Sequence, residues 1–87
     1  MNKRAVGSGT EERAEEYLKR CLLRKPNEPA LYNNLAMLQL ELGKLDAAKL
    51  NVDKALKLVP DAAAIQDTRN LVDKAIKERA EHEAGKK

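Results

Sequence analysis

Few side chains in this chain are of the kinds that carry out chemistry. Cys21 is the only cysteine and His82 the only histidine, so neither has a second thiol or imidazole at the spacing that a zinc site needs. We interpret Cys21 as a buried small residue rather than a nucleophile, because no base is evident near it. His82 is interpreted as a solvated side chain. We therefore expect no metal site and no cofactor.

The remaining candidates for catalysis are equally weak. Ser8 stands in a Gly-Ser-Gly stretch without the lysine of a phosphate-binding loop or the partners of a catalytic triad. Charged helix surfaces routinely produce pairs of carboxylates, and two such pairs occur here: Glu15 with Glu16, and Glu81 with Glu83. The sequence therefore predicts a protein that is not an enzyme.

Charge and hydropathy argue against a nucleic-acid-binding, membrane-spanning or secreted protein. The 17 basic side chains against 14 acidic ones leave a formal charge of only +3. The basic cluster between Lys19 and Lys25 has no interleaved aromatic residues, so we expect no nucleic-acid partner. No apolar run is long enough for a membrane span, and no signal peptide is evident. A lone cysteine gives no sign of an oxidising compartment, so a cytoplasmic location is the default expectation.

Leu and Ala dominate the apolar residues and favour helix, so the elements that carry these side chains are expected to be α-helical throughout. We predict helices over residues 11–25, 29–42, 45–58 and 61–81. Thr10 and Asp61 are the expected N-caps, Pro29 fits the first position of a helix, and Gly43 fits the position just after one. Residues 1–10 are interpreted as a disordered tail and residues 82–87 as a frayed one.

The segment between Pro29 and Pro60 carries a spaced pattern of large and small residues. Its members are Tyr32, Leu35, Ala36, Gln39, Ala48, Val52, Ala55 and the closing Pro60. This pattern resembles the tetratricopeptide repeat (TPR), W-x2-L-G-x2-Y…A-x3-F…P, a helix–turn–helix unit of about 34 residues. The resemblance implies a protein-binding scaffold, with residues 29–62 forming one full repeat.

The same template extends in one direction only. Moved back by one repeat length, it matches Ala14, Leu18, Cys21 and Pro26, so residues 11–26 resemble the second half of a preceding repeat. Moved forward, it places Gln66, Arg69, Asn70 and Asp73 where apolar or small residues belong. Residues 61–81 are therefore expected to form a polar capping helix. The predicted fold is all-α: an antiparallel, TPR-like solenoid fragment of about four helices with a C-terminal cap.

The resemblance also implies where a partner binds, because the first helix of each hairpin lines a concave face that holds a peptide or a helix of another protein. We call the corresponding side chains the concave-face residues: Ala30, Asn33, Asn34, Met37, Leu40 and Glu41. Amides can bond a peptide backbone, and Met adapts to varied partners. The alternative is that Asn34 only bridges to a neighbouring helix and Met37 packs against the fourth helix. The chaperone-tail clamp of some relatives is not predicted, since only Asn34 matches its residues.

A second surface remains open in this scheme. The helix over residues 11–25 has a face that its missing partner would have covered, and an exposed apolar face on a small domain marks an interface. The self-association face would comprise Tyr17, Leu18, Cys21 and Leu22. A homodimer that buries it is the alternative function, a small structural domain without a separate ligand.

Overall fold

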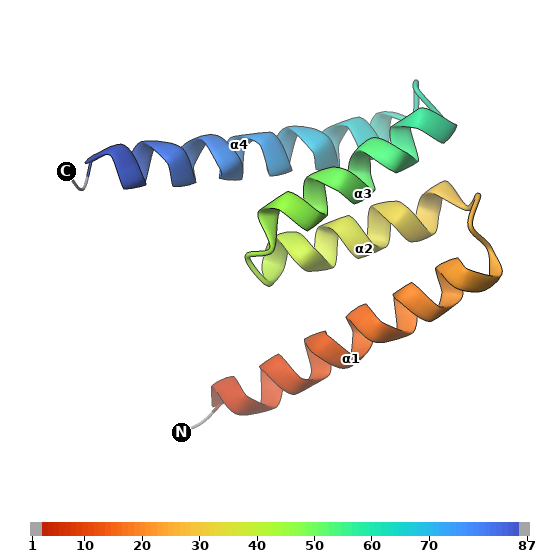
Figure 1. The fold of residues 1–87 in the computed structure, drawn as a ribbon, viewed down its shortest axis with the longest axis horizontal. Helices are drawn as coiled ribbons and strands as arrows, with labels where there is room; N and C mark the ends of the chain where they lie inside the picture. The colour runs from red at the N-terminus through yellow and green to blue at the C-terminus, as the bar shows by residue number, and fades with distance from the viewer. Residues whose placement is uncertain (1–2, 86–87) are drawn as a thin grey trace.

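The computed structural model describes the backbone of residues 3–85 and the side chains of residues 9–85. Over this part of the chain it consists of helices and short connections, without a strand (Figure 1). The elements are α1 (Lys3–Arg24), α2 (Pro29–Glu41), α3 (Leu45–Leu58) and α4 (Ala63–Gly85). Successive helices run antiparallel and lie side by side (Figure 1). The all-α prediction is confirmed.

The central hairpin of α2 and α3 follows the sequence signals closely. Pro29 opens α2 at its first turn, and α3 has the predicted bounds. Gly43 has a φ of 80°, the left-handed conformation that glycine adopts without steric cost. The Lys44 N–H bonds to the Gln39 carbonyl at 2.8 Å and closes the turn between the two helices.

The outer helices are both longer than expected. α1 begins at Lys3, so residues 3–10 are helical and Thr10 lies inside the helix instead of capping it. Residues 1–2 lie outside the described part. A glycine destabilises a helix by only about 1 kcal/mol relative to alanine. Gly7 and Gly9 therefore do not end α1, whose later residues pack against α2.

The start of α4 is also corrected. The Ala62 carbonyl accepts the N–H groups of Ile65 and Gln66, and α4 begins at Ala63, so Asp61 is not its N-cap. The helix continues to Gly85, which makes residues 82–85 helical rather than frayed; residues 86–87 lie outside the described part. The end of α4 projects beyond the α2–α3 turn (Figure 1), and residues 77–85 are all exposed.

The core lies among α2, α3 and α4. Ala36, Ala48 and Ala55 are fully buried together with Val52 and Val72. Because alanine adds almost no bulk beyond the backbone, these positions allow neighbouring helices to approach closely. Half-buried apolar side chains surround this centre: Tyr32, Leu40, Leu56, Ala62 and Ile76.

α4 retains the half of the repeat pattern that faces α3. Ile65 and Val72 are buried in the core cluster, and they stand one repeat length after Leu31 and Leu38 of α2. Leu31 and Leu38 are seven residues apart, so they share one face of α2. That face is turned to the preceding helix, since Leu31 and Cys21 of α1 line the same hollow. α4 therefore docks on α3 as α2 docks on α1.

The other half of the pattern is absent from α4. Ala36 and Leu40 of α2 pack in the core against α3, whereas their counterparts one repeat length later, Asn70 and Lys74, are polar and exposed. A following helix would meet polar side chains at these two positions. This division supports the prediction that α4 caps the array.

Candidate partner-binding surfaces

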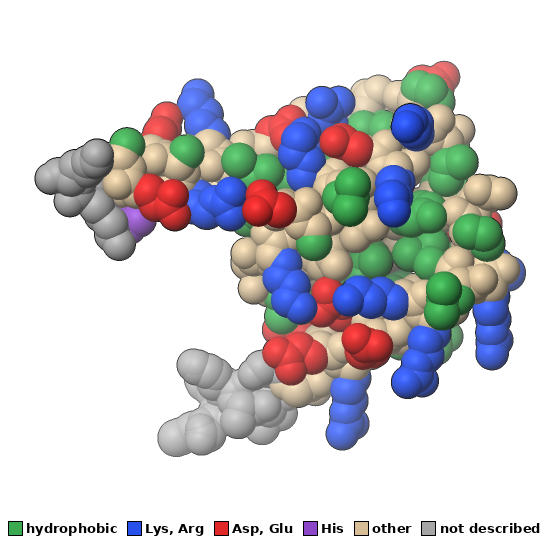
Figure 2. Space-filling model, in the orientation of Figure 1, with side chains coloured by type: hydrophobic (Ala, Val, Ile, Leu, Met, Phe, Trp, Pro, Cys, Tyr) green, Lys and Arg blue, Asp and Glu red, His purple; other side chains and the backbone are tan. Residues whose placement is uncertain are grey.

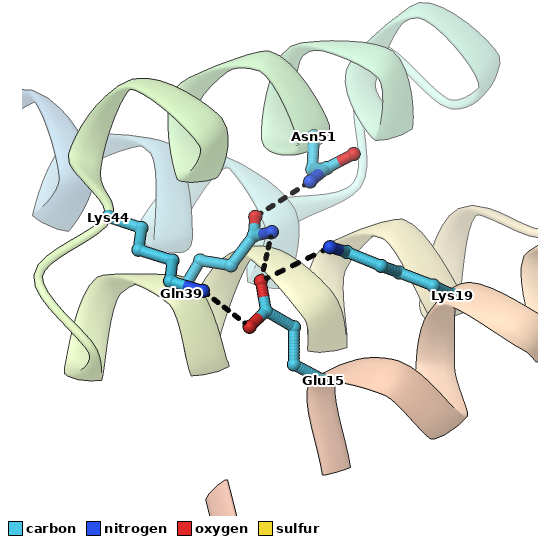
Figure 3. A network of polar contacts seen from close by, with 5 residues as sticks. All are labelled: Glu15, Lys19, Gln39, Lys44 and Asn51. Carbon is cyan, nitrogen blue, oxygen red and sulfur yellow. Dashed lines mark hydrogen bonds and ion pairs between the residues drawn. The ribbon is translucent and has the colours of Figure 1, made fainter. Parts of the chain in front are cut away.

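A buried carboxylate joins α1 to the rest of the molecule (Figure 3). Glu15 is only 4% exposed. Its Oε1 accepts a hydrogen bond from Lys44 Nζ at 2.7 Å, and its Oε2 accepts one from Gln39 Nε2 at 3.0 Å. Lys19 Nζ lies 3.7 Å from Oε2. The interpretation of Glu15 as a solvated surface carboxylate is therefore wrong.

The network continues from α2 to α3 through Gln39. Its Oε1 accepts a hydrogen bond from Asn51 Nδ2 at 2.7 Å, so one buried amide links both neighbouring helices (Figure 3). The hydrogen bonds from Lys44 and then Gln39 lower the pKa of Glu15 below its usual value of 4.5, although burial opposes the shift. The hydrogen bond to Glu15 in turn raises the pKa of Lys44 above 10.5. Glu15 is therefore ionised at neutral pH.

The same contact recurs one repeat length later. Lys49 on α3 and Asp73 on α4 stand at the positions of Glu15 and Gln39, and their Nζ and Oδ1 atoms lie 3.3 Å apart. Asp53, at the position of Lys19, also pairs with Lys49, at 3.6 Å. A polar pair at equivalent positions thus joins α1 to α2 and α3 to α4. The charged residue on the first helix of each pair is acidic in α1 and basic in α3.

The concave-face residues divide into an exposed row and a partly buried edge. Ala30, Asn34, Met37 and Glu41 are exposed, while Asn33 and Leu40 are partly buried. Met37 is 46% exposed, so it leaves much of its thioether side chain on the surface. Leu40 packs against the core cluster.

Asn33 holds an unusual position at the edge of this row. Its Nδ2 donates to Met37 Sδ at 3.8 Å, a weak acceptor. Its Oδ1 is buried and has no hydrogen-bond partner among the residues that the structure describes. Buried polar atoms are nearly always paired, so this amide is poorly satisfied.

A shallow hollow lies between α1 and α2 and adjoins the exposed row. It is lined by Cys21, Arg24, Lys25, Glu28, Ala30 and Leu31. The nearby connection between the two helices is fixed by Tyr32, whose hydroxyl donates to the Pro26 carbonyl at 2.9 Å. Ala30 belongs to both surfaces, so the hollow extends the exposed row toward α1.

The predicted self-association face is only partly open. Tyr17 is 66% exposed, whereas Leu18, Cys21 and Leu22 are half-buried. Leu18 and Leu22 lie three and seven residues after Glu15, which places them on the face of α1 that meets α2. The structure thus assigns Leu18 and Leu22 to the intramolecular contact and leaves Tyr17 outside it.

In residues 3–85, none of the helices combines the length and the apolar character needed to cross a bilayer. Within the same part of the chain, no three or more His, Cys, Asp or Glu side chains are grouped so that they could hold a metal ion.

The repeat geometry described above agrees with a comparison against family models. A tetratricopeptide repeat model matches residues 5–72, which include α2, α3 and parts of α1 and α4. The chain belongs to the tetratricopeptide repeat family, whose members are generally non-catalytic scaffolds for protein–protein interaction. Searches of the curated proteins and of the solved structures gave no significant match.

Proposed function

We propose that this domain binds a peptide or a helix of another protein along α2, through the exposed row Ala30, Asn34, Met37 and Glu41. The observation that carries the proposal is the unsatisfied Asn33 amide beside the half-exposed Met37. A ligand N–H would give the Asn33 carbonyl oxygen the partner that it lacks, after a rotation of the amide. The flexible Met37 side chain can move aside and pack on the ligand.

The hollow between α1 and α2 supports the same proposal. It offers Cys21 and Leu31 as an apolar floor, with Arg24, Lys25 and Glu28 among its polar lining. A ligand that runs along α2 would reach this hollow over Ala30. Apolar anchor pockets with a polar rim are the usual makeup of peptide-binding surfaces.

The experiment begins with a random-peptide library selected on the immobilised full chain. The affinity of a selected peptide is then measured by fluorescence polarisation for the chain and for the triple variant Asn33→Ala, Met37→Ala, Glu41→Ala. We expect the triple variant to bind at least about tenfold more weakly, a loss of roughly 1.4 kcal/mol, with unchanged helicity by circular dichroism.

A matched control replaces three exposed residues of α3, Leu50, Lys54 and Lys57, by alanine. This control should bind the peptide as the unchanged chain does. Equal affinity for the triple variant on α2 would place the binding surface elsewhere and refute the proposal. The side-chain amide signals of Asn33 and Asn34 in a proton–nitrogen NMR spectrum provide a direct map, since both should shift on titration with the peptide.

A further inference from the structure

α1 lacks the cover that α2 provides for α3. Ala48 and Ala55 of α3 are fully buried, and their counterparts one repeat length earlier are Ala14 and Cys21. Ala14 is exposed and Cys21 is half-buried. With Tyr17 between them, they form a strip at positions i, i+3 and i+7, which lie on one side of a helix. We call Ala14, Tyr17 and Cys21 the α1 strip.

The opposite end of the molecule cannot cover this strip well. The outer side of α4 carries four exposed polar side chains, Asp67, Asn70, Lys74 and Lys77, although Leu71 beside them is apolar and 55% exposed. Stacking α4 of one copy on α1 of the next would place these charges on Tyr17. Burial of charge without a partner is unfavourable, so head-to-tail stacking is disfavoured.

Charge along α1 is divided between its two halves. Residues 9–16 hold four acidic side chains and one basic one, and residues 19–25 hold four basic side chains and no acidic one. Figure 2 shows acidic side chains toward the N-terminal part of α1 and basic ones toward its C-terminal end. Among the described residues, the salt bridges of α1 all involve Glu15, so the exposed Glu12, Glu16, Arg20 and Arg24 form none.

We propose that the α1 strip binds the α1 strip of a second copy of this chain, with the two helices antiparallel. A two-fold axis near residues 17 and 18 places Ala14 opposite Cys21 of the second copy and brings the Tyr17 rings together. It also brings Glu16 near Arg20 of the second copy, twice by symmetry. A parallel pair would set the acidic halves against each other. The antiparallel pair is a closed, isologous interface that stops at two copies.

Sedimentation equilibrium of the full chain tests the association. From about 10 to about 500 µM the mean mass should rise from that of one chain, 9.7 kDa, toward twice that value, as for a micromolar-to-millimolar dissociation constant. Tyr17→Asp should weaken the association at least about tenfold. The control Leu71→Asp changes an apolar side chain of similar exposure on α4, 55% against 66%, and should have no effect. A mass of one chain over the whole range overturns the proposal and leaves the strip to a preceding helix of a longer chain.

Cysteine cross-linking tests the orientation. In the antiparallel pair, the two native Cys21 residues are about seven residues apart along the helices, or about 10 Å, beyond disulfide reach. The variant Ala14→Cys places a thiol opposite Cys21 of the second copy. Under copper-phenanthroline oxidation it should form a covalent dimer, whereas the unchanged chain and the double variant Ala14→Cys, Cys21→Ser should not. Rapid cross-linking of the unchanged chain through Cys21 would indicate a parallel pair and overturn the orientation.

Charge reversal gives an independent test of the register. Glu16→Arg should weaken the association at least about tenfold, because each copy then places two arginines together. Adding Arg20→Glu to the same chain should restore it. If the double variant stays as weak as the single one, Glu16 and Arg20 do not meet across the axis and the proposed register is wrong.

Discussion

At the scale of single residues, the most informative pair is Glu15 and Gln39. Gln39 stands where the repeat pattern has a tyrosine, and the residue is only 2% exposed, between α1 and α3. A buried amide needs partners of fixed geometry, which Glu15 and Asn51 supply. The aromatic contact of the pattern is thus replaced here by directional hydrogen bonds. Such bonds specify how α1 sits on α2 more narrowly than apolar contact would.

This pair predicts how acid affects stability. Because the folded-state pKa of Glu15 is lowered below 4.5, ionised Glu15 stabilises the fold at pH values above 4.5. That stability is lost as the pH falls through the lowered pKa. Glu15→Gln removes the charge at every pH and should cost about 1 kcal/mol near neutral pH. The difference between the two chains should shrink progressively below pH 4.5, as measured by urea unfolding.

The control for this prediction is Glu12→Gln, an exposed residue on the same helix without an ion pair in the described residues. Its effect should stay within about 0.5 kcal/mol. All measurements belong at low micromolar concentration, where a chain that self-associates weakly is monomeric. A constant difference between the unchanged chain and Glu15→Gln down to low pH would show that the carboxylate does not stabilise the fold through its ionised form.

At the scale of elements, the three core alanines determine how closely the helices pack. Ala48 on α3 is fully buried in the core cluster against the neighbouring helices, so Ala48→Leu adds three carbon atoms where there is no space. Overpacking of this kind costs about 1–3 kcal/mol, measurable as a lower melting temperature. The control Ala80→Leu adds the same atoms at an exposed position on α4 and should leave the melting temperature unchanged. Equal melting temperatures for both variants would mean that Ala48 is not at a close helix contact.

The elements also show how far sequence reasoning reaches. The hairpin of α2 and α3 was predictable because Pro29 and Gly43 act locally, through a missing N–H and a left-handed φ. The ends of α1 and α4 were not, since Thr10 and Asp61 are favourable caps that these helices do not use. Alternative end points of a helix differ little in free energy. The residue type at one position therefore does not determine where the helix begins or ends.

The candidate sites were predictable to different degrees. The exposed row of α2 follows from helix periodicity, and Met37 and Asn34 lie on the surface as the pattern indicates. The buried Glu15 was missed because a charged side chain is almost never buried unless it is paired, and its partners come from α2 and from the turn after it. One feature of the sequence could have indicated the contact: Glu15 and Gln39 stand one repeat length before Lys49 and Asp73, so a polar pair occurs at the same two positions in successive repeats.

At the scale of the whole molecule, the two ends of the array differ. α4 presents polar side chains outward, whereas α1 presents Ala14, Tyr17 and Cys21. Solenoid ends need a polar outer face to remain soluble, and only the α4 end has one. We therefore expect a further helix to add at the α1 end of this array more readily than at the α4 end.

This asymmetry predicts the effect of making the α4 end apolar. Asn70→Leu and Lys74→Leu together restore the apolar character that Ala36 and Leu40 have in α2. The altered α4 can then cover the α1 strip of another copy in a head-to-tail contact, which does not close and so builds chains of copies. Size-exclusion chromatography with light scattering should show masses above two copies, increasing with concentration. Adding Tyr17→Asp should reverse this growth, because it removes the surface on which α4 stacks. A double variant on α4 with the mass distribution of the unchanged chain would show that residues other than Asn70 and Lys74 end the array.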